Sequence, residues 1–124
     1  MRLLLDTHLL LWALSGPSRL SPAARKQIRN AEVYVSAASI WEISIKSALG
    51  KLKADPAVVL AAIEPTGFSM LPITGQHAAK VAELPPLHRD PFDRMLVAQA
   101  SVEPMILFTN DDVLAAYGSF VTLS

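Results

Sequence analysis

The stretch RLLLDTHLLLWAL, residues 2–14, places two kinds of apolar segment one after the other. Its first part, residues 2–6, is a short leucine run without alternation, which is typical of a strand covered on both faces. Its second part, residues 7–14, predicts a helix for which Thr7 is a possible cap. A buried strand that passes directly into a helix is the repeating unit of α/β proteins with a parallel sheet.

The rest of the chain repeats this alternation of strands and helices. The predicted strands cover residues 32–36, 68–73, 105–109 and 119–123. The predicted helices cover residues 21–31, 37–49, 55–67, 74–84, 92–103 and 111–118, and residues 85–91 form a proline-rich loop. The alternation predicts a parallel sheet with helices on both faces. With 124 residues and no internal repeat or low-complexity tract, residues 1–124 are expected to form a single domain.

Composition limits the classes of protein to which the chain can belong. Apolar residues make up 52% and charged residues 18%, which fits a globular domain and excludes a disordered one. Eleven basic residues balance eleven acidic ones, so no overall charge points to a nucleic acid or a membrane. The absence of cysteine fits a reducing compartment, and we expect the protein in the cytoplasm. Asp6 and His8 interrupt the N-terminal apolar run, and no stretch has the ~18 uninterrupted apolar residues of a membrane span.

Several carboxylates occur at positions that a parallel sheet brings to one edge. Asp6 ends the first predicted strand, and Asp111 follows the fourth. The segment HRDPFDRMLVAQA, residues 88–100, adds Asp90 in a loop and Asp93 in the first turn of an apolar helix. Ligands of open parallel sheets bind at the carboxyl ends of the strands, so these acids are candidates for a site.

Each acid also has a plain structural explanation. Asp6 and Asp111 could cap the helices that follow them, and Asp93 could complement a helix dipole. Glu42 lies inside an apolar helix, where it could pair with Lys46 one turn away. A buried carboxylate without a partner is costly, so Glu42 and Asp93 are the hardest of these acids to explain by structure alone.

Carboxylates that converge at one edge require a positive charge among them. With no cysteine and few histidines, an all-oxygen site suits a hard cation such as Mg²⁺ or Mn²⁺. Such an ion lowers the pKa of a bound water and neutralises a substrate phosphate, which is the chemistry of phosphodiester hydrolysis. Whether one or two ions are used stays open.

Four motifs resemble those of PIN-domain nucleases, in order and over nearly the whole chain. They are LLLDTHLLLWAL, SAASIWEISIKSALGKL, HRDPFDRMLVAQA and LFTNDD. The chain is most similar to the VapC-type toxins of bacterial and archaeal toxin–antitoxin pairs. The resemblance implies a three-layer α/β/α fold, divalent-metal-dependent ribonuclease activity on RNA, and a cognate VapB-type antitoxin as partner.

The resemblance also implies roles for individual residues. The metal-binding and catalytic acids of the family fall on Asp6, Glu42, Asp93 and Asp111. Thr7 and Thr109 match polar positions near the ion, where a hydroxyl would orient a metal-bound water or a carboxylate. Asp93, and not Asp90, matches the third acid because it directly precedes the RMLVAQA helix, which leaves Asp90 as a supporting group or a helix contact. Asn110 and Asp112 are adjacent alternatives to the fourth acid.

RNA binding requires cations near the acids, because phosphate contacts supply much of the affinity. Lys46 lies one turn beyond Glu42, and Arg89 and Arg94 flank the two acids of the third motif. We expect these three cations to contact the RNA backbone. His88 could assist proton transfer, although a loop histidine after two prolines is more often merely exposed.

The apolar excess predicts a protein partner. The segments at 7–14, 21–31 and 50–63 offer more apolar surface than one small core needs. A homodimer or a groove for an antitoxin helix would cover this surface, and the alternative is that all of it is intramolecular core. Trp12 and Trp41 are expected to pack inside the domain rather than to stack on bases.

Two other functions are compatible with parts of the pattern. A receiver-type phosphorylated signalling domain has a similar sheet, but it needs an Asp after its third strand and a Lys after its fifth. Neither residue is present at these positions. A PIN-like module that binds RNA or a partner without hydrolysis is the second alternative, and the retention of four acids argues against it.

Overall fold

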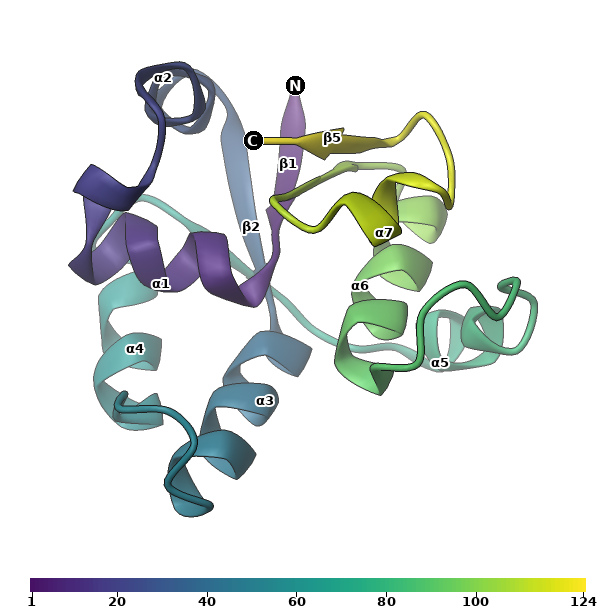
Figure 1. Cartoon of the computed structure of the whole chain (residues 1–124), viewed down its shortest axis with the longest axis horizontal. Helices are drawn as coiled ribbons and strands as arrows, with labels where there is room; N and C mark the ends of the chain where they lie inside the picture. Colours follow the sequence, from purple (N-terminus) through teal and green to yellow (C-terminus); the bar gives the residue numbers. More distant parts are fainter.

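Five strands form one sheet in the computed structural model, which describes all 124 residues. The strands are β1 (Arg2–Leu5), β2 (Glu32–Ser36), β3 (Ser69–Leu71), β4 (Ile106–Thr109) and β5 (Val121–Leu123). Their order across the sheet is β3-β2-β1-β4-β5, and every neighbouring pair is parallel (Figure 1). The predicted α/β class with a central parallel sheet is therefore confirmed.

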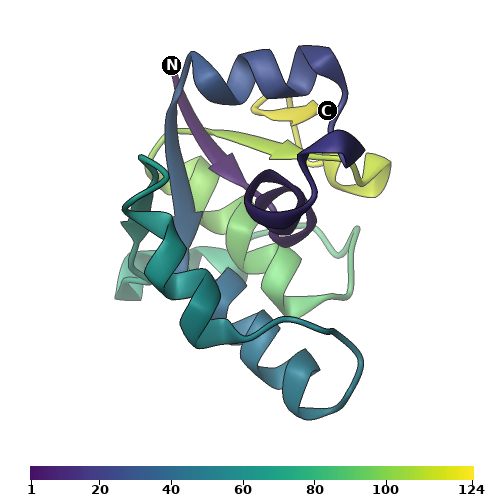
Figure 2. The ribbon, with the colours of Figure 1, turned by 90° about the vertical axis from the view of Figure 1, so that its left-hand side faces the viewer.

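Helices cover both faces of this sheet. They are α1 (Thr7–Ser15), α2 (Pro22–Arg29), α3 (Ala37–Ala48), α4 (Pro56–Ile63), α5 (Gly75–Val81), α6 (Pro91–Val102) and α7 (Asp112–Ala115), with a 3₁₀ turn η1 (Pro17–Arg19) after α1. The helices α1 to α4 pack on one face, whereas α6 and α7 pack on the other and α5 packs against α6 (Figures 1 and 2). None of these helices has the length and apolar character needed to cross a membrane.

The central strand β1 explains the leucine run at the start of the chain. Leu3 and Leu5 contribute to the core beneath α1 to α4, whereas Leu4 contributes to the core beneath α6. None of the three side chains is more than 1% exposed. Because both faces of the strand are covered, every one of these positions is apolar and no alternation appears in the sequence.

The strand order fixes where the sheet can bind a ligand. From β1 the chain moves outward to β2 and β3, and it then returns to the other side of β1 to form β4 and β5. The crevice between the carboxyl ends of β1 and β4 is thus the topological switch point, where open parallel sheets bind their ligands. Receiver-type domains have the order 2-1-3-4-5 instead, so the signalling-domain alternative is wrong.

Polar caps begin the helices at most of the predicted positions. The side chains of Ser21, Asp55 and Thr74 each accept a hydrogen bond from a backbone N–H in the first turn of α2, α4 and α5, respectively. The predicted strand at 68–73 is shorter than expected. It ends at Leu71 because the next residue, Pro72, has no N–H to continue the ladder.

A buried polar cluster joins α5 to α6. The His77 side chain is fully buried, and its Nδ1 accepts a hydrogen bond from the Thr74 N–H at 3.0 Å. The other ring nitrogen, Nε2, therefore carries the proton and donates to Glu103 Oε2 at 2.5 Å. The side-chain amide of Gln99 completes the cluster, 3.3 Å from Nδ1. These contacts give a structural role to a histidine for which the sequence predicted none.

We expect His77→Ala to lower the free energy of unfolding by about 2–3 kcal/mol, because Glu103 and the Thr74 N–H lose their buried partner. Urea denaturation measures the loss. The matched control is Lys80→Ala on the same helix, since the Lys80–Glu83 pair lies near the surface at 3.6 Å and contributes less than about 1 kcal/mol. Equal stability of the two variants would contradict the role assigned to His77.

Candidate metal centre

Acids from the ends of two neighbouring strands meet in the crevice between β1 and β4. Asp6 directly follows β1, and Asp111 lies just beyond the end of β4. The buried Thr109 hydroxyl donates to Asp6 Oδ2 at 2.5 Å and accepts from the Asp111 N–H at 3.0 Å. Thr109 therefore connects the two loops that carry these acids.

Asp6 caps α1 and also accepts a hydrogen bond from the end of β4. Its Oδ1 accepts from the Leu9 N–H at 2.8 Å and so caps α1, while its Oδ2 receives the Thr109 hydroxyl. Burial raises the pKa of this carboxyl, and the hydrogen bonds from Thr109 and Leu9 oppose the rise. The cap and the threonine together fix the orientation of a carboxylate that is only 3% exposed.

Glu42 reaches the same region from α3. Its Oε1 accepts from the Thr7 hydroxyl at 2.6 Å, and its Oε2 accepts from Lys46 Nζ at 2.5 Å. The hydrogen bond to Glu42 raises the pKa of Lys46, which keeps the ammonium charged. The pair between Glu42 and Lys46 that the sequence allowed is present, but it is not a surface contact, because Glu42 is buried at 4% exposure.

The N-terminus of α6 contributes Asp93. Asp90 is the cap of this helix, since its Oδ1 accepts from the N–H groups of Phe92 at 2.8 Å and of Asp93 at 3.3 Å. The pKa of Asp93 is raised to about 7, chiefly by burial and then by the negative charges of Asp90 and Glu42. His88 opposes the rise. Asp93 thus lies among acids that make its ionisation unfavourable.

His88 lies close to two of the acids, which the sequence did not indicate. Its Nδ1 accepts from the Asp90 N–H at 3.0 Å, so its Nε2 carries the proton. Nε2 lies 3.1 Å from Asp111 Oδ2 and 3.5 Å from Asp93 Oδ2. A histidine after two prolines was expected to be exposed, but its side chain is 19% exposed and lies between two of the predicted metal-binding acids.

The donor atoms of this crevice suit a hard divalent cation. One ring nitrogen of His88 and one carboxylate oxygen each of Asp93 and Asp111 lie within 4.8 Å of one another, and because His88 Nε2 carries a proton, the oxygens are the atoms that would bind a cation. Asp6 and Glu42 lie outside this closest group, and their oxygens accept hydrogen bonds from the two threonines and from Lys46. Carboxylate oxygens are the ligands that Mg²⁺ and Mn²⁺ prefer, and a divalent cation would neutralise the charge that raises the pKa of Asp93.

The three cations expected near the acids differ in what their side chains contact. Arg89 is exposed and makes no ion pair or side-chain hydrogen bond. Lys46 is paired with Glu42 and its side chain stays 36% exposed. The Arg94 guanidinium instead donates to the backbone carbonyl oxygens of Val81, the last residue of α5, and of Pro85 in the following loop, each at 3.0 Å. Arg94 therefore braces a loop, and its donors are occupied by the protein.

Fold and site together define a parallel α/β protein with an acidic centre at the switch point of its sheet. The model of the PIN domain family matches residues 3–119, which is nearly the whole chain. The chain belongs to the PIN domain family. The sequence matches no curated protein.

Three solved structures are similar to this chain in fold. The first is VapBC2 from Rickettsia felis bound to a DNA fragment from their promoter, with a TM-score of 0.71, 15% identity, and coverage of 100% of this chain and 98% of that chain. DNA-bound VapBC from Salmonella typhimurium follows, with a TM-score of 0.68, 15% identity and coverage of 100% and 97%. FitAcB from Neisseria gonorrhoeae has a TM-score of 0.65, 19% identity and coverage of 98% and 95%. At these identities the likeness shows the fold alone.

Asp93 gives the metal-free protein a predictable dependence on pH. The native state keeps the Asp93 proton up to a pH of about 7, whereas the unfolded chain releases it near the ordinary pKa of 3.8. Between these values the native state binds more protons than the unfolded state, so the free energy of unfolding falls as the pH rises. Because the side chain is partly exposed, we expect a loss of about 2 kcal/mol, which is less than full linkage would give.

Urea denaturation in EDTA at about pH 5 and about pH 7.5 measures this loss, with Asp93→Asn beside the wild type. The asparagine cannot ionise, so the variant should gain stability relative to the wild type as the pH rises. Asp112→Asn replaces an exposed acid and should follow the wild type. Parallel pH profiles of the wild type and Asp93→Asn would contradict the raised pKa.

Proposed function

We propose that the protein is a divalent-metal-dependent endoribonuclease and the toxin of a toxin–antitoxin pair. The observation that carries the proposal is the group of acids at the switch point of the sheet, with His88 between Asp93 and Asp111. PIN domains are generally nucleases, and the chain belongs to that family. Two of the three similar structures are of VapBC, which supports a toxin of the VapC type.

Each side chain of the site has a distinct task in the proposed reaction. A bound Mg²⁺ or Mn²⁺ would supply a water of lowered pKa and neutralise charge on the scissile phosphate. The Thr7 and Thr109 hydroxyls orient Glu42 and Asp6 by donating to them. His88 donates its Nε2–H to Asp111 at 3.1 Å and lies 3.5 Å from Asp93 Oδ2. The carboxylates that would hold the ion are those of Asp6, Glu42, Asp93 and Asp111.

Two cations are the proposed contacts for the RNA backbone. Arg89 is exposed and has no protein partner, and Lys46 stays partly exposed beside Glu42. Phosphate groups are the ligands such cations bind, and they position the strand without reading its sequence. We leave Arg94 out, because its guanidinium donates to backbone carbonyls. The lack of cysteine and an RNA substrate both favour the cytoplasm as the place of action.

We expect Asp6→Asn and Asp93→Asn to lower kcat/KM for Mn²⁺-dependent cleavage of structured RNAs by at least about a hundredfold, because each removes a charged oxygen ligand. Asparagine still caps helices, so Asp6→Asn should keep the fold, which circular dichroism checks. The matched control is Asp90→Asn, whose amide still caps α6 and which should stay within about threefold of the wild type.

Cleavage is measured on denaturing gels, with and without Mn²⁺, and EDTA should stop it reversibly. Loss of activity in Asp90→Asn with full activity in Asp93→Asn would move the third acid to Asp90. If the wild type binds RNA but does not cut it in Mn²⁺ or Mg²⁺, the protein is the non-hydrolytic binding module instead.

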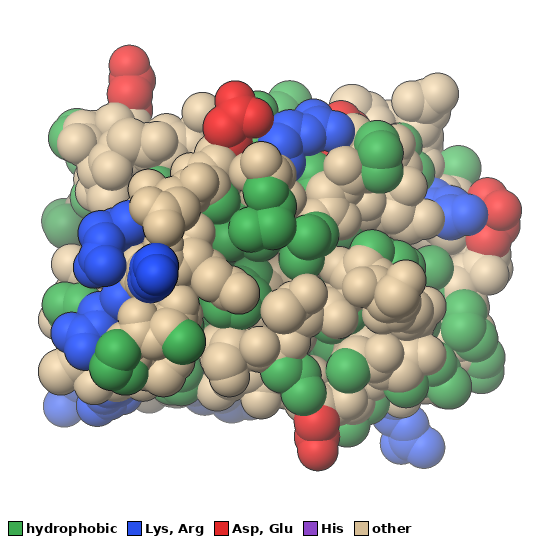
Figure 3. Space-filling model, turned by 90° about the horizontal axis from the view of Figure 1, so that it is seen from above, with side chains coloured by type: hydrophobic (Ala, Val, Ile, Leu, Met, Phe, Trp, Pro, Cys, Tyr) green, Lys and Arg blue, Asp and Glu red, His purple; other side chains and the backbone are tan.

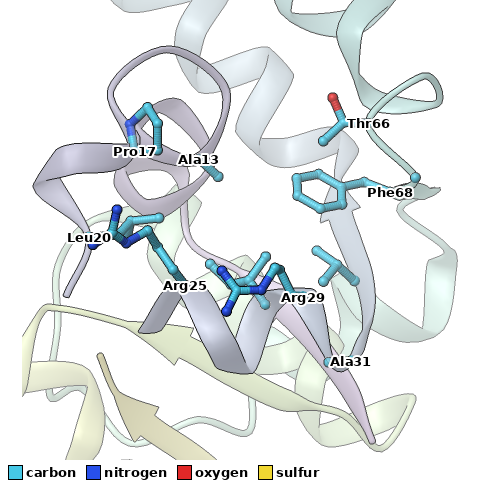
Figure 4. Close-up of a pocket in the computed structure, with 11 residues that line it drawn as sticks. Ala13, Pro17, Leu20, Arg25, Arg29, Ala31, Thr66 and Phe68 are labelled. Carbon is cyan, nitrogen blue, oxygen red and sulfur yellow. The ribbon is translucent and has the colours of Figure 1, made fainter. Parts of the chain in front are cut away.

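We propose that the antitoxin binds a groove between α1, α2 and the segment before β3. The groove has a volume of about 520 Å³, and its apolar lining includes Leu20, Ile28 and Phe68. Figure 4 shows Arg25 and Arg29 in the same pocket as Leu20 and Phe68. Two of the segments expected to offer partner surface, 7–14 and 21–31, border this groove.

The charge beside the groove indicates what kind of segment would fill it. Residues 17–31 include four cations and no acid, and none of the four makes an ion pair or a side-chain hydrogen bond. Figure 3 shows basic side chains gathered on the left of the view, where α2 lies. An apolar groove beside unpaired arginines fits an amphipathic segment that carries large apolar side chains and carboxylates. The four cations are Arg19, Arg25, Lys26 and Arg29.

The partner in this test is the antitoxin encoded by the neighbouring reading frame. The double variant Arg25→Glu/Arg29→Glu should bind this antitoxin at least about tenfold more weakly than the wild type does. The two glutamates would repel the carboxylates of the partner. Isothermal titration calorimetry measures the affinity, and RNA cleavage by the free variant should be unchanged. Lys53→Glu changes an exposed cation that does not line the groove and is the matched control. Equal affinity of the two variants would contradict the assignment of the groove.

The expected homodimer remains a prediction. Ile45 on α3 and Leu49, the cap at its C-terminal end, are exposed by 37% and 63%, and a second copy of the chain would find apolar surface there. Light scattering tests this prediction by measuring the molar mass of the protein in solution.

A further inference from the structure

Trp41 does not pack in the core as we expected. Its side chain is 59% exposed on α3, although a tryptophan exposes much apolar area to water. The ring contacts that of Phe92 edge to face, with centroids 5.0 Å apart and planes at 82°. This geometry fixes the two rings relative to each other and leaves much of the indole accessible.

The two rings come from the helices that supply two acids of the candidate metal centre. Trp41 directly precedes Glu42 on α3, and Phe92 directly precedes Asp93 in the first turn of α6. The helices α3 and α6 contact each other, and Figure 1 shows them side by side near the carboxyl end of the sheet. The aromatic pair therefore spans the two helices that supply Glu42 and Asp93, and the exposed Arg89 lies a few residues from Phe92.

We propose that Trp41 and Phe92 form a platform on which an unpaired nucleobase of the RNA substrate stacks, next to the phosphate held at the metal centre. This inference rests on the proposed function. Aromatic side chains beside cations are the usual means by which proteins bind single strands, because every base has a π-face and every nucleotide a phosphate. The bases of a duplex are stacked on one another, so the platform selects RNA that is unpaired at the cleavage site.

Charge favours a nucleobase over a protein as the occupant of this surface. Interface cores between proteins are depleted of charged residues. Trp41 instead lies within two turns of the charged residues Glu42 and Lys46. Its ring contacts Phe92, which is followed by Asp93. Ile45 on α3 and Leu49 just beyond its end are also exposed, and the molar mass of the variants below decides whether a second copy of the chain covers this surface.

Fluorescence of Trp41 tests the platform without any cleavage. In a Trp12→Phe background Trp41 is the only tryptophan, so its emission reports contact with a base. The protein is titrated in EDTA and low salt with a short single-stranded RNA, with a hairpin of the same length and with an abasic oligomer of the same charge. We expect the single strand to quench the emission strongly, and the hairpin and the abasic oligomer to quench it little.

Variants then separate stacking from other roles. Trp41→Ala should bind the single-stranded RNA about tenfold more weakly than the wild type, and Trp41→Phe should restore most of the affinity because phenylalanine still stacks. Ile45→Ala, an exposed apolar residue on the same helix, is the matched control and should bind like the wild type. Fluorescence anisotropy of labelled RNA measures the affinities, and light scattering measures the molar mass of each variant.

The outcomes distinguish a failure of the platform from a failure of the proposed function. Unchanged RNA affinity in Trp41→Ala, or equal quenching by the abasic oligomer, overturns the platform and leaves the ribonuclease proposal intact. A change from dimer to monomer in Trp41→Ala with unchanged RNA affinity also overturns it and makes Trp41 an interface residue. If the wild type binds none of the RNAs and cuts none in Mn²⁺, both proposals fail.

Discussion

One buried hydrogen bond, from the Thr109 hydroxyl to Asp6, joins residues 103 positions apart in the chain. It forms because β1 and β4 are neighbours in the sheet, although the chain builds β2 and β3 between them. The same threonine accepts from the Asp111 N–H and so holds the loop after β4 against the end of β1. The candidate site depends on this neighbour relation, since no local segment of the sequence contains its acids.

Much of the fold was predictable because it follows from local rules. The leucine run of β1 requires a strand covered on both faces, and caps such as Ser21 and Asp55 mark where helices begin. The acids were predictable for a related reason. Asp6 and Asp111 follow strands, and the carboxyl ends of parallel strands share one edge of the sheet. Periodicity and position relative to an element were sufficient for both inferences.

What the sequence did not reveal depends on the direction of side chains between distant segments. His88 follows two prolines in a loop, and only the folded chain shows that its Nε2 lies between two carboxylates. Arg94 has the same charge as Arg89, but its guanidinium donates to backbone carbonyls whereas Arg89 is free. Trp41 lies in an apolar helix, yet its side chain is 59% exposed and its ring contacts that of Phe92 on another helix. Sequence spacing does not encode these differences.

Several carboxylates lie in a crevice where ionisation of Asp93 is unfavourable, and a divalent cation is what would offset that cost. The most direct test is therefore a titration of the protein with Mn²⁺, followed by electron paramagnetic resonance of the free ion. The account predicts saturable binding by the wild type and little or none by Asp93→Asn. Binding that is absent in the wild type, or that survives unchanged in Asp93→Asn, would contradict it.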